Sequence, residues 1–333
     1  MTLLPATACP KRMVYGPCEG VHADGGCELG DRRCVFLDGP LPVHPAPERT
    51  RAGAPLSRSA ADLLAIAGRR PIVVAELVAP VGPDGHRSVA GRLAGAVDAA
   101  VIGDAPWARV QLPAGTRAAL LQGEGVRPIV GLTCRDRNRV ALEGELLGLA
   151  AADVPMVLCL TGDHPAIGGR PDAEPVFDLD STRLAALAAD RGMAVAVAES
   201  PSAPPVALRP ARLASKAAAG ATVCFVNHGP AADVERFVAA AGTVAPSMRF
   251  VVSVPVGATE RGRARLAAFF PDADRAALAE PDAAVAHAVA TAERMLGLAG
   301  VIGVDLSAAA GAGEEQQVAG ALAAVGRALG AGT

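Results

Sequence analysis

Two acidic side chains are the candidates for proton transfer in this chain. Glu76 interrupts the apolar run Pro71–Val78, and Asp163 follows the apolar run Val154–Leu160. A carboxylate among apolar neighbours is unfavourable unless it is paired or used, and desolvation raises its pKa toward neutrality, where it becomes a proton donor. The alternative for Glu76 is a rim carboxylate paired with an arginine. The alternative for Asp163 is a turn cap, which the following His164-Pro165 favours.

A second group of reactive residues lies at the start of the chain, where four of the seven cysteines occur: Cys9, Cys18, Cys27 and Cys34. This Gly- and Pro-rich segment is too small to fold unaided, and a tetrahedral metal would supply the missing stability. We expect zinc, or as second choice an iron–sulfur cluster, with His22 able to replace one thiolate. The spacing is wider than that of paired C-x-x-C motifs, and the alternative is four reduced thiols on a surface loop.

Three arginines, Arg135, Arg137 and Arg139, form a basic cluster after the apolar run that ends at Leu132. Guanidinium groups suit carboxylates and phosphates, so the cluster is a candidate for binding an anionic part of a substrate or cofactor. The alternative, solvated arginines paired with Asp136, carries equal weight.

Alternating patterns predict the elements that position these residues. We expect eight strands, at 71–78, 97–102, 127–132, 154–160, 193–198, 222–226, 250–254 and 301–306. Stretches with helical spacing lie between them, for example at 88–96. In another, Leu142, Leu146 and Leu149 form a stripe after a candidate cap at Asp136 or Asn138. This alternation over about 260 residues favours a (β/α)8 TIM barrel, which keeps its chemistry at the carboxyl ends of the strands. A helix at 60–67 is expected to close the other end.

Composition sets the domain plan and the broad class. We expect a Cys-rich metal-binding module at 1–38, a Pro-rich linker at 39–58 and the barrel at 59–333. No apolar run is long enough to span a membrane, Met1–Pro10 lacks signal-peptide features, and the net charge of −3 favours neither nucleic acid nor a membrane surface. The sequence therefore predicts a soluble cytoplasmic protein.

Two of the loops carry a family resemblance. Residues 133–139 (TCRDRNR), followed by LTGDHP at 160–165, resemble the methylenetetrahydrofolate reductase family, and weaker similarity runs from about Pro71 to Gly330. The cysteine segment is similar to a module (CPK…GPC…C…C) that accompanies some of these reductases, although often at the other end or on a partner subunit. The resemblance implies the same barrel.

The resemblance also implies residue roles. Glu76, in a motif that shares one proline (Pro80) with the family, would protonate the folate N10 as the methylene bridge opens to an iminium. Asp163 would bind the amino-pyrimidine ring of the pterin. Asn227, Arg135 and Arg137 are the further expected substrate contacts, and Thr133, Gly162 and Lys216 are the expected cofactor contacts. Lys216 matches a family lysine near the flavin phosphates, with an exposed helix position as the alternative.

Several departures from the family pattern fall on flavin and folate contacts. Gly131 stands where the family has His before the LTC motif, Val226-Asn227 stands in place of Thr-Gln, and the small run Ser307–Gly311 replaces a late basic residue. The losses fit the flavin-free branch, in which a reduced nicotinamide (NADH or NADPH) passes hydride directly, so FAD is expected to be weakly bound or absent. His228, beside Asn227, could supply a substitute hydrogen bond, although a surface role is the favoured interpretation.

The resulting expectation is reduction of 5,10-methylenetetrahydrofolate to 5-methyltetrahydrofolate. The alternative is a folate-binding companion protein whose metal module docks on an electron-transfer or methyltransferase partner, which the altered pterin contacts and the cysteines favour. A corrinoid- or folate-dependent methyltransferase is a third, weaker reading, because those enzymes also use this barrel.

Overall fold

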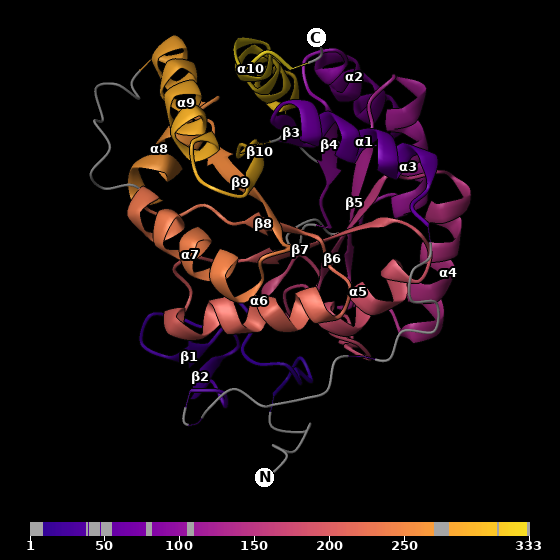
Figure 1. Ribbon diagram of the computed structural model, residues 1–333, viewed down its shortest axis with the longest axis vertical. Helices are drawn as coiled ribbons and strands as arrows, with labels where there is room; N and C mark the ends of the chain where they lie inside the picture. Colours follow the sequence, from indigo (N-terminus) through magenta and orange to yellow (C-terminus); the bar gives the residue numbers. More distant parts are fainter. Residues whose placement is uncertain are drawn as a thin grey trace.

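Eight parallel strands form a closed barrel in the computed structural model, which describes residues 9–37, 39, 47, 55–77, 82–104, 110–269, 280–311 and 313–331. The strands follow chain order around the ring, and the last pairs with the first (Figure 1). They are β3 (Ile72–Glu76), β4 (Ala99–Ile102), β5 (Pro128–Thr133), β6 (Met156–Leu160), β7 (Ala194–Glu199), β8 (Val223–Val226), β9 (Arg249–Pro255) and β10 (Val301–Ser307). The (β/α)8 barrel predicted from the alternating pattern is confirmed.

Helices surround the strands as an outer ring (Figure 1). They are α1 (Arg58–Arg69), α2 (Pro83–Leu93), α3 (Ala114–Gly123), α4 (Arg139–Ala151), α5 (Ser181–Ala189), α6 (Arg209–Ala218), α7 (Ala231–Val244), α8 (Glu260–Phe269), α9 (Pro281–Leu296) and α10 (Glu315–Ala328). On α4 the predicted stripe Leu142, Leu146 and Leu149 is buried, and of the two candidate caps Asn138 is the one that accepts from the helix, at Ala141 N.

The inside of the barrel is a packed apolar core below the carboxyl ends of the strands. Inward side chains such as Val74, Ile129, Met156 and Val251 fill it, and they form one cluster with Leu63 of α1. Helix α1 therefore closes the amino-terminal end, as the sequence predicted. The strands are buried on both faces, which explains their nearly continuous apolar sequences.

The cysteine segment forms a small irregular module with two short antiparallel strands, β1 (Gly26–Cys27) and β2 (Gly30–Arg33). It lies beside α6 (indigo in Figure 1) and bonds to residues that follow barrel strands: His164, after β6, donates to Glu28, and Arg209, after β7, donates to Cys18 O. The module thus covers part of the end of the barrel at which the strands have their carboxyl ends. Most of the linker predicted at 39–58 lies outside the described residues.

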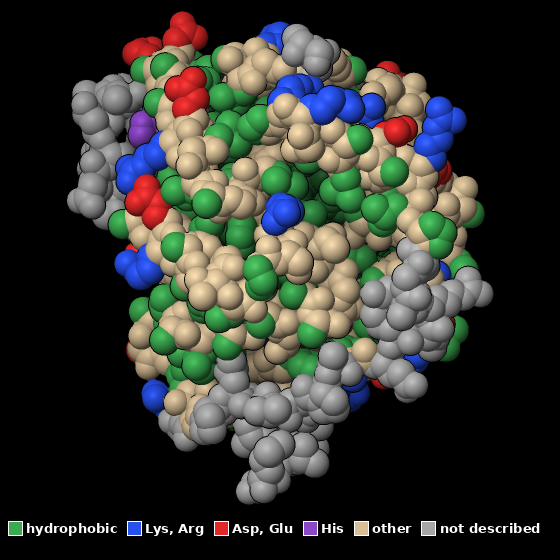
Figure 2. Space-filling view, viewed as in Figure 1, with side chains coloured by type: hydrophobic (Ala, Val, Ile, Leu, Met, Phe, Trp, Pro, Cys, Tyr) green, Lys and Arg blue, Asp and Glu red, His purple; other side chains and the backbone are tan. Residues whose placement is uncertain are grey.

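The surface shows charges of both signs around the rim of the face seen in Figure 2, with apolar side chains between them. Within the described residues, no helix has the length and apolar character needed to cross a bilayer.

Candidate functional site

One large cavity, of about 1220 Å³, opens at the carboxyl ends of the barrel strands. Its lining includes residues at or just after the ends of all eight strands, as is usual for the active sites of this fold. Glu76 and Asp163 both line it. The structure therefore brings together the two acidic side chains that the sequence singled out, although they are 87 positions apart in the chain.

Glu76 is the last residue of β3 and its side chain faces the cavity. The side chain is solvent-accessible, but the solvent that it meets is that of the cavity, and the barrel wall surrounds the carboxyl group on its other sides. Desolvation raises the pKa of Glu76 to about 7. The group is thus half-protonated at neutral pH, the state suited to a general acid. The proline of its motif, Pro80, lies outside the described residues.

A third acidic residue, Asp305 of β10, lies close to Glu76 and was missed in the sequence. Asp305 is 2% exposed, lines the same cavity and accepts a hydrogen bond from Ser253 Oγ at 3.2 Å. Burial raises the pKa of Asp305 well above its ordinary value, and the charge of Glu76 raises it further. The signal that identified Glu76, a carboxylate within an apolar strand, is also present in Val304-Asp305-Leu306 and was sufficient to find it.

Asp163 follows β6 in the loop that enters the short 3-10 helix Pro165–Ile167. His164, not Asp163, caps this helix, because its Nδ1 accepts from Ala166 N at 3.2 Å. The turn-cap alternative for Asp163 is therefore wrong. Among the described residues no hydrogen bond or ion pair engages the Asp163 carboxylate, so it is available to a ligand with N–H donors.

The cysteine module supplies part of the cavity lining. We call Lys11, Cys18, Glu19 and Gly20 the roof, because these four residues line the cavity from the module side. The ammonium of Lys11 pairs with Glu28 at 2.6 Å, and Glu28 also accepts from His164 N at 3.0 Å. A Cβ at Gly20 would lie 1.9 Å from a Glu28 carboxylate oxygen, so a side chain there would displace the Glu28 carboxylate from its present position. The roof is thus fixed to the loop that carries Asp163.

A fully buried ion cluster holds the other side of the module. Glu199, at the end of β7, forms ion pairs with three cations of α6: Lys216 at 2.7 Å, Arg212 at 2.9 Å and Arg209 at 3.6 Å. Burial alone would raise the pKa of Glu199, but these three cations lower it below its ordinary value, so the carboxylate is ionised. Arg209 also donates to Cys18 O at 3.0 Å. Glu199, which the sequence analysis missed, therefore organises the residues that dock the module.

Lys216, the expected phosphate ligand, belongs to this cluster. It is 2% exposed and donates to Glu199 and to Ala198 O, so the alternative of an exposed helix residue is wrong. Although Lys216 lines the cavity, its ammonium group is already paired with Glu199.

Asn227 and His228 line the cavity after β8. The Asn227 amide, an expected substrate contact, donates to the carboxylate of Glu19 in the roof. Burial raises the pKa of Glu19 and lowers the pKa of His228, so His228 is a neutral imidazole at physiological pH. A substrate that uses Asn227 must therefore replace or share the bond to Glu19.

The predicted arginine ligands lie away from the cavity. Arg135 and Arg137 pair with Asp104 at 3.1 and 2.9 Å and also with Asp136, and neither lines the cavity. Thr133 does line it, but its hydroxyl donates to Asp104 at 2.7 Å. These positions favour the alternative in which the arginines form local ion pairs, and they give no support to substrate binding by Arg135 and Arg137.

Two glycines lie where neighbouring strands and loops approach closely. A Cβ at Gly131, one of the departures from the family pattern, would lie 3.0 Å from Ile102 O of the neighbouring strand, so a larger side chain there would require the end of β4 to shift. Gly162 has a φ of +87°, and a Cβ there would lie 2.9 Å from the Thr133 Cβ. The loops after β5 and β6 therefore approach each other closely at the expected cofactor contacts.

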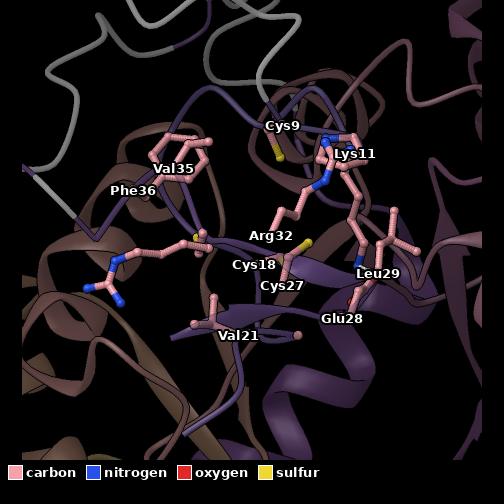
Figure 3. Close-up of a pocket in the computed structure, with 14 residues that line it drawn as sticks. Cys9, Lys11, Cys18, Val21, Cys27, Glu28, Leu29, Arg32, Val35 and Phe36 are labelled. Carbon is pink, nitrogen blue, oxygen red and sulfur yellow. Dashed lines mark ion pairs between the residues drawn. The ribbon is translucent and has the colours of Figure 1, made fainter. Parts of the chain in front are cut away.

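All four module cysteines line a second, small pocket that holds about 20 Å³, which is room for one water-sized particle. Figure 3 shows the sulfur atoms of Cys9 and Cys27 pointing toward a common space. The N–H of Gly20 donates to the Cys18 sulfur, and the N–H of Phe36 donates to the Cys34 sulfur. Lys11, Cys18 and Gly20 line both cavities, so they form the wall between the thiol pocket and the barrel mouth.

The donor set of this pocket fits zinc or an iron–sulfur cluster in type and number. In the described part of the chain, however, no three Cys, His, Asp or Glu side chains stand close enough to share one ion. Burial also raises the pKa of Cys18 and Cys34, as expected for neutral thiols. Metal binding would therefore require the four thiols to move closer together and to lose their protons.

Metal analysis tests this expectation directly. The purified chain is expected to hold about one zinc ion, or the iron and sulfide of one cluster, and the double variant Cys9→Ser/Cys27→Ser is expected to hold none because two ligands are lost. Elemental mass spectrometry and a visible spectrum provide the measurement. Cys224→Ala, which changes a buried thiol of the barrel, is the matched control. Equal metal content in all three proteins would contradict the expectation that the module cysteines bind the metal.

Comparisons with known proteins support the fold and the module separately. A family model described as methylene-tetrahydrofolate reductase C terminal matches residues 2–39. Tryptophan synthase from M. tuberculosis is similar in structure, with a TM-score of 0.50 and 13% identity over 82% of this chain and 99% of that chain. A mutant tryptophan synthase alpha-subunit from Pyrococcus furiosus gives a TM-score of 0.43 and 11% identity, over 71% and 86% of the two chains. No curated protein matches the chain. The comparisons thus show a TIM barrel preceded by a short segment that is similar to the family described as methylene-tetrahydrofolate reductase C terminal.

Proposed function

We propose that this chain reduces 5,10-methylenetetrahydrofolate to 5-methyltetrahydrofolate with NADH or NADPH and without flavin. The observation that carries the proposal is that Glu76 and Asp163 line one cavity at the carboxyl end of the barrel. The family model over residues 2–39 supports the same function, because its description names this reductase.

The lining chemistry suits a pterin. Glu76, Asp163 and Asp305 present carboxyl groups to the cavity, and these groups match the N–H donors of an amino-pyrimidine ring. In the mechanism Asp163 would hold the ring, and Glu76 would transfer its proton to N10 as the methylene bridge opens to an iminium. A reduced nicotinamide, when bound, supplies the hydride that converts the iminium to a methyl group. The roof would keep bulk water away from the iminium.

Turnover tests the proposal. The purified full-length chain should oxidise NADH or NADPH only when methylenetetrahydrofolate is present, and 5-methyltetrahydrofolate should accumulate in equal amount. Absorbance at the nicotinamide band and chromatography of the folates provide the two measurements. Folate binding without any turnover would refute the enzyme assignment.

Asp163→Asn is expected to weaken folate binding by about tenfold to a hundredfold, because a charge-assisted pair of hydrogen bonds is worth roughly 1.5–3 kcal/mol. Titration calorimetry measures this affinity. Asp172→Asn, on an exposed carboxylate paired with Arg170, is the matched control and should bind as the wild type does. Equal affinity of both variants would show that Asp163 does not contact the ligand.

One observation favours a second candidate, a folate-binding companion protein docked on an electron-transfer or methyltransferase partner. Each Lys and Arg among the described cavity-lining residues is already paired with a carboxylate: Lys11 with Glu28, and Arg212 and Lys216 with Glu199. No cation in that lining is without a carboxylate partner, so the phosphates of a nicotinamide would have to compete for one that is already paired. Calorimetry with NADH, NADPH and folate separates the two candidates, because the companion would bind folate alone.

A further inference from the structure

Asp305 is a buried carboxyl group that the proposed reaction does not yet use. In the sheet register it lies opposite Val74 of β3 and Ser253 of β9. Side chains alternate along a strand, so Val74 and Glu76 face the same side, and that side is the barrel interior. Asp305 therefore lies one inward position below Glu76, on the adjacent strand.

The two oxygens of Asp305 have different surroundings. Oδ2 accepts a hydrogen bond from Ser253 Oγ at 3.2 Å, whereas Oδ1 is buried and no hydrogen-bond donor of the described residues reaches it. A buried polar atom without a partner is unfavourable and calls for an explanation. A proton on Oδ1 explains it, because a neutral carboxylic acid is far less costly to bury than a carboxylate.

The surroundings of Asp305 also favour its neutral, protonated form. Burial is the main cause of the raised pKa of Asp305, the charge of Glu76 adds to it, and the Ser253 hydroxyl partly opposes it. Glu76 is the charged group that acts on Asp305 from a neighbouring strand. The other ionisable groups of the described cavity lining belong to elements other than β3 and β10: Lys11, Cys18, Glu19, His86, Asp104, Cys159, Asp163, Arg212, Lys216, His228 and Glu315.

We propose that Asp305 is a positioning residue for proton transfer by Glu76: it stays a neutral carboxylic acid and donates its O–H, through Oδ1, to the Glu76 carboxylate. The inference rests on the proposed role of Glu76 as proton donor. In that step the Glu76 O–H bond breaks, an N–H bond forms on the ligand, and the electron pair stays on the Glu76 carboxylate. The Asp305 O–H bond stays intact, and cavity water returns the proton to Glu76. The pair therefore never carries more than one negative charge.

Two substitutions at Asp305 separate this role from a structural one. Asp305→Asn keeps an N–H donor toward Glu76, whereas Asp305→Leu has a similar shape and no donor. The Glu76 titration, with a midpoint near pH 7 in the wild type, is expected to move by less than about half a pH unit in Asp305→Asn. In Asp305→Leu it is expected to rise by about one pH unit or more, because a hydrogen bond to the charged form is lost.

Carboxyl ¹³C NMR of the full-length chain, labelled at glutamate, measures these midpoints without any ligand. The signal that disappears in Glu76→Gln identifies the residue. Ser253→Ala is the matched control: it removes the donor to Oδ2 and should leave the midpoint of Glu76 unchanged. An unchanged midpoint in Asp305→Leu, or equal shifts in Asp305→Asn and Asp305→Leu, would overturn the proposal.

If Asp305→Leu does not fold, the pH dependence of stability provides a second test of the proposal. A carboxyl group whose folded-state pKa is raised binds more proton in the folded than in the unfolded state, so it makes stability fall as pH rises above about 4. Asp305→Asn should therefore reduce the slope of unfolding free energy against pH, between pH 5 and 7, by about one proton. An unchanged slope would overturn the proposal. These titrations need no substrate, so absence of folate turnover would refute the proposed function while leaving the carboxyl pair in place.

Discussion

Glu76→Gln is expected to lower the rate of methylenetetrahydrofolate reduction by about 10²- to 10⁴-fold, the usual contribution of a general acid. Glutamine keeps the shape of the side chain at the end of β3 but has no proton to transfer to N10. Folate affinity should change little, because Asp163, and not Glu76, is the proposed anchor of the pterin. Steady-state kinetics and calorimetry give the two quantities.

The pH dependence of the wild type provides the matching test. Desolvation raises the pKa of Glu76 to about 7, and only the protonated form is a proton donor. The rate at saturating substrate should therefore be constant below about pH 6 and fall about tenfold per pH unit above about pH 8. Glu235→Gln, which removes a surface ion pair with Arg294, is the matched control and should keep both the rate and its pH profile. A rate that is independent of pH between 6 and 9 would remove Glu76 from the mechanism.

Glu199→Gln is expected to lower the free energy of unfolding by about 3–5 kcal/mol, because it removes the buried carboxylate that Arg209, Arg212 and Lys216 share. Since Arg209 and Arg212 also bond to the backbone of the module, the roof should detach from the cavity as well. Denaturant unfolding measures the first effect. Faster proteolysis within residues 9–37 measures the second.

Glu143→Gln is the matched control for this variant. Glu143 pairs with Arg139 on the surface of α4, and such exposed pairs contribute about 0–1 kcal/mol. A Glu199→Gln protein as stable as this control would show that the buried cluster does not hold the module. If stability falls but residues 9–37 stay protected, the contact of Glu28 with His164 is sufficient for docking.

Much of the barrel was predictable because its pattern is local. Each barrel strand is an apolar run flanked by helical spacing, and all eight predicted strands overlap observed strands by at least four residues. The helix predicted at 60–67 lies within α1, and Leu63 of α1 packs into the barrel interior as expected. Boundaries differ by a few residues, as for α2, which begins at Pro83 rather than near Ser88. Proline at the first helical position and Asp84 in the first turn explain the earlier start.

The candidate site was predictable only in part. Glu76 and Asp163 could be found because each breaks or follows an apolar strand, and strand order places both at one end of a barrel. Arg135 and Arg137 could not be judged from sequence, since their partner Asp104 comes about 30 positions earlier, after another strand. Lys216 likewise looked like a possible phosphate ligand until Glu199 was seen beside it.

The sequence by itself determined the barrel, the cysteine segment before it and the two acidic residues at its mouth, because apolar periodicity and local composition encode them. Only the tertiary structure decided that the module roofs the cavity, that Glu19 meets Asn227 and that Asp305 stands below Glu76. These contacts join residues separated by roughly 200 positions, and they depend on strand closure and buried charge pairing. Neither strand closure nor buried charge pairing produces a periodic pattern in the sequence.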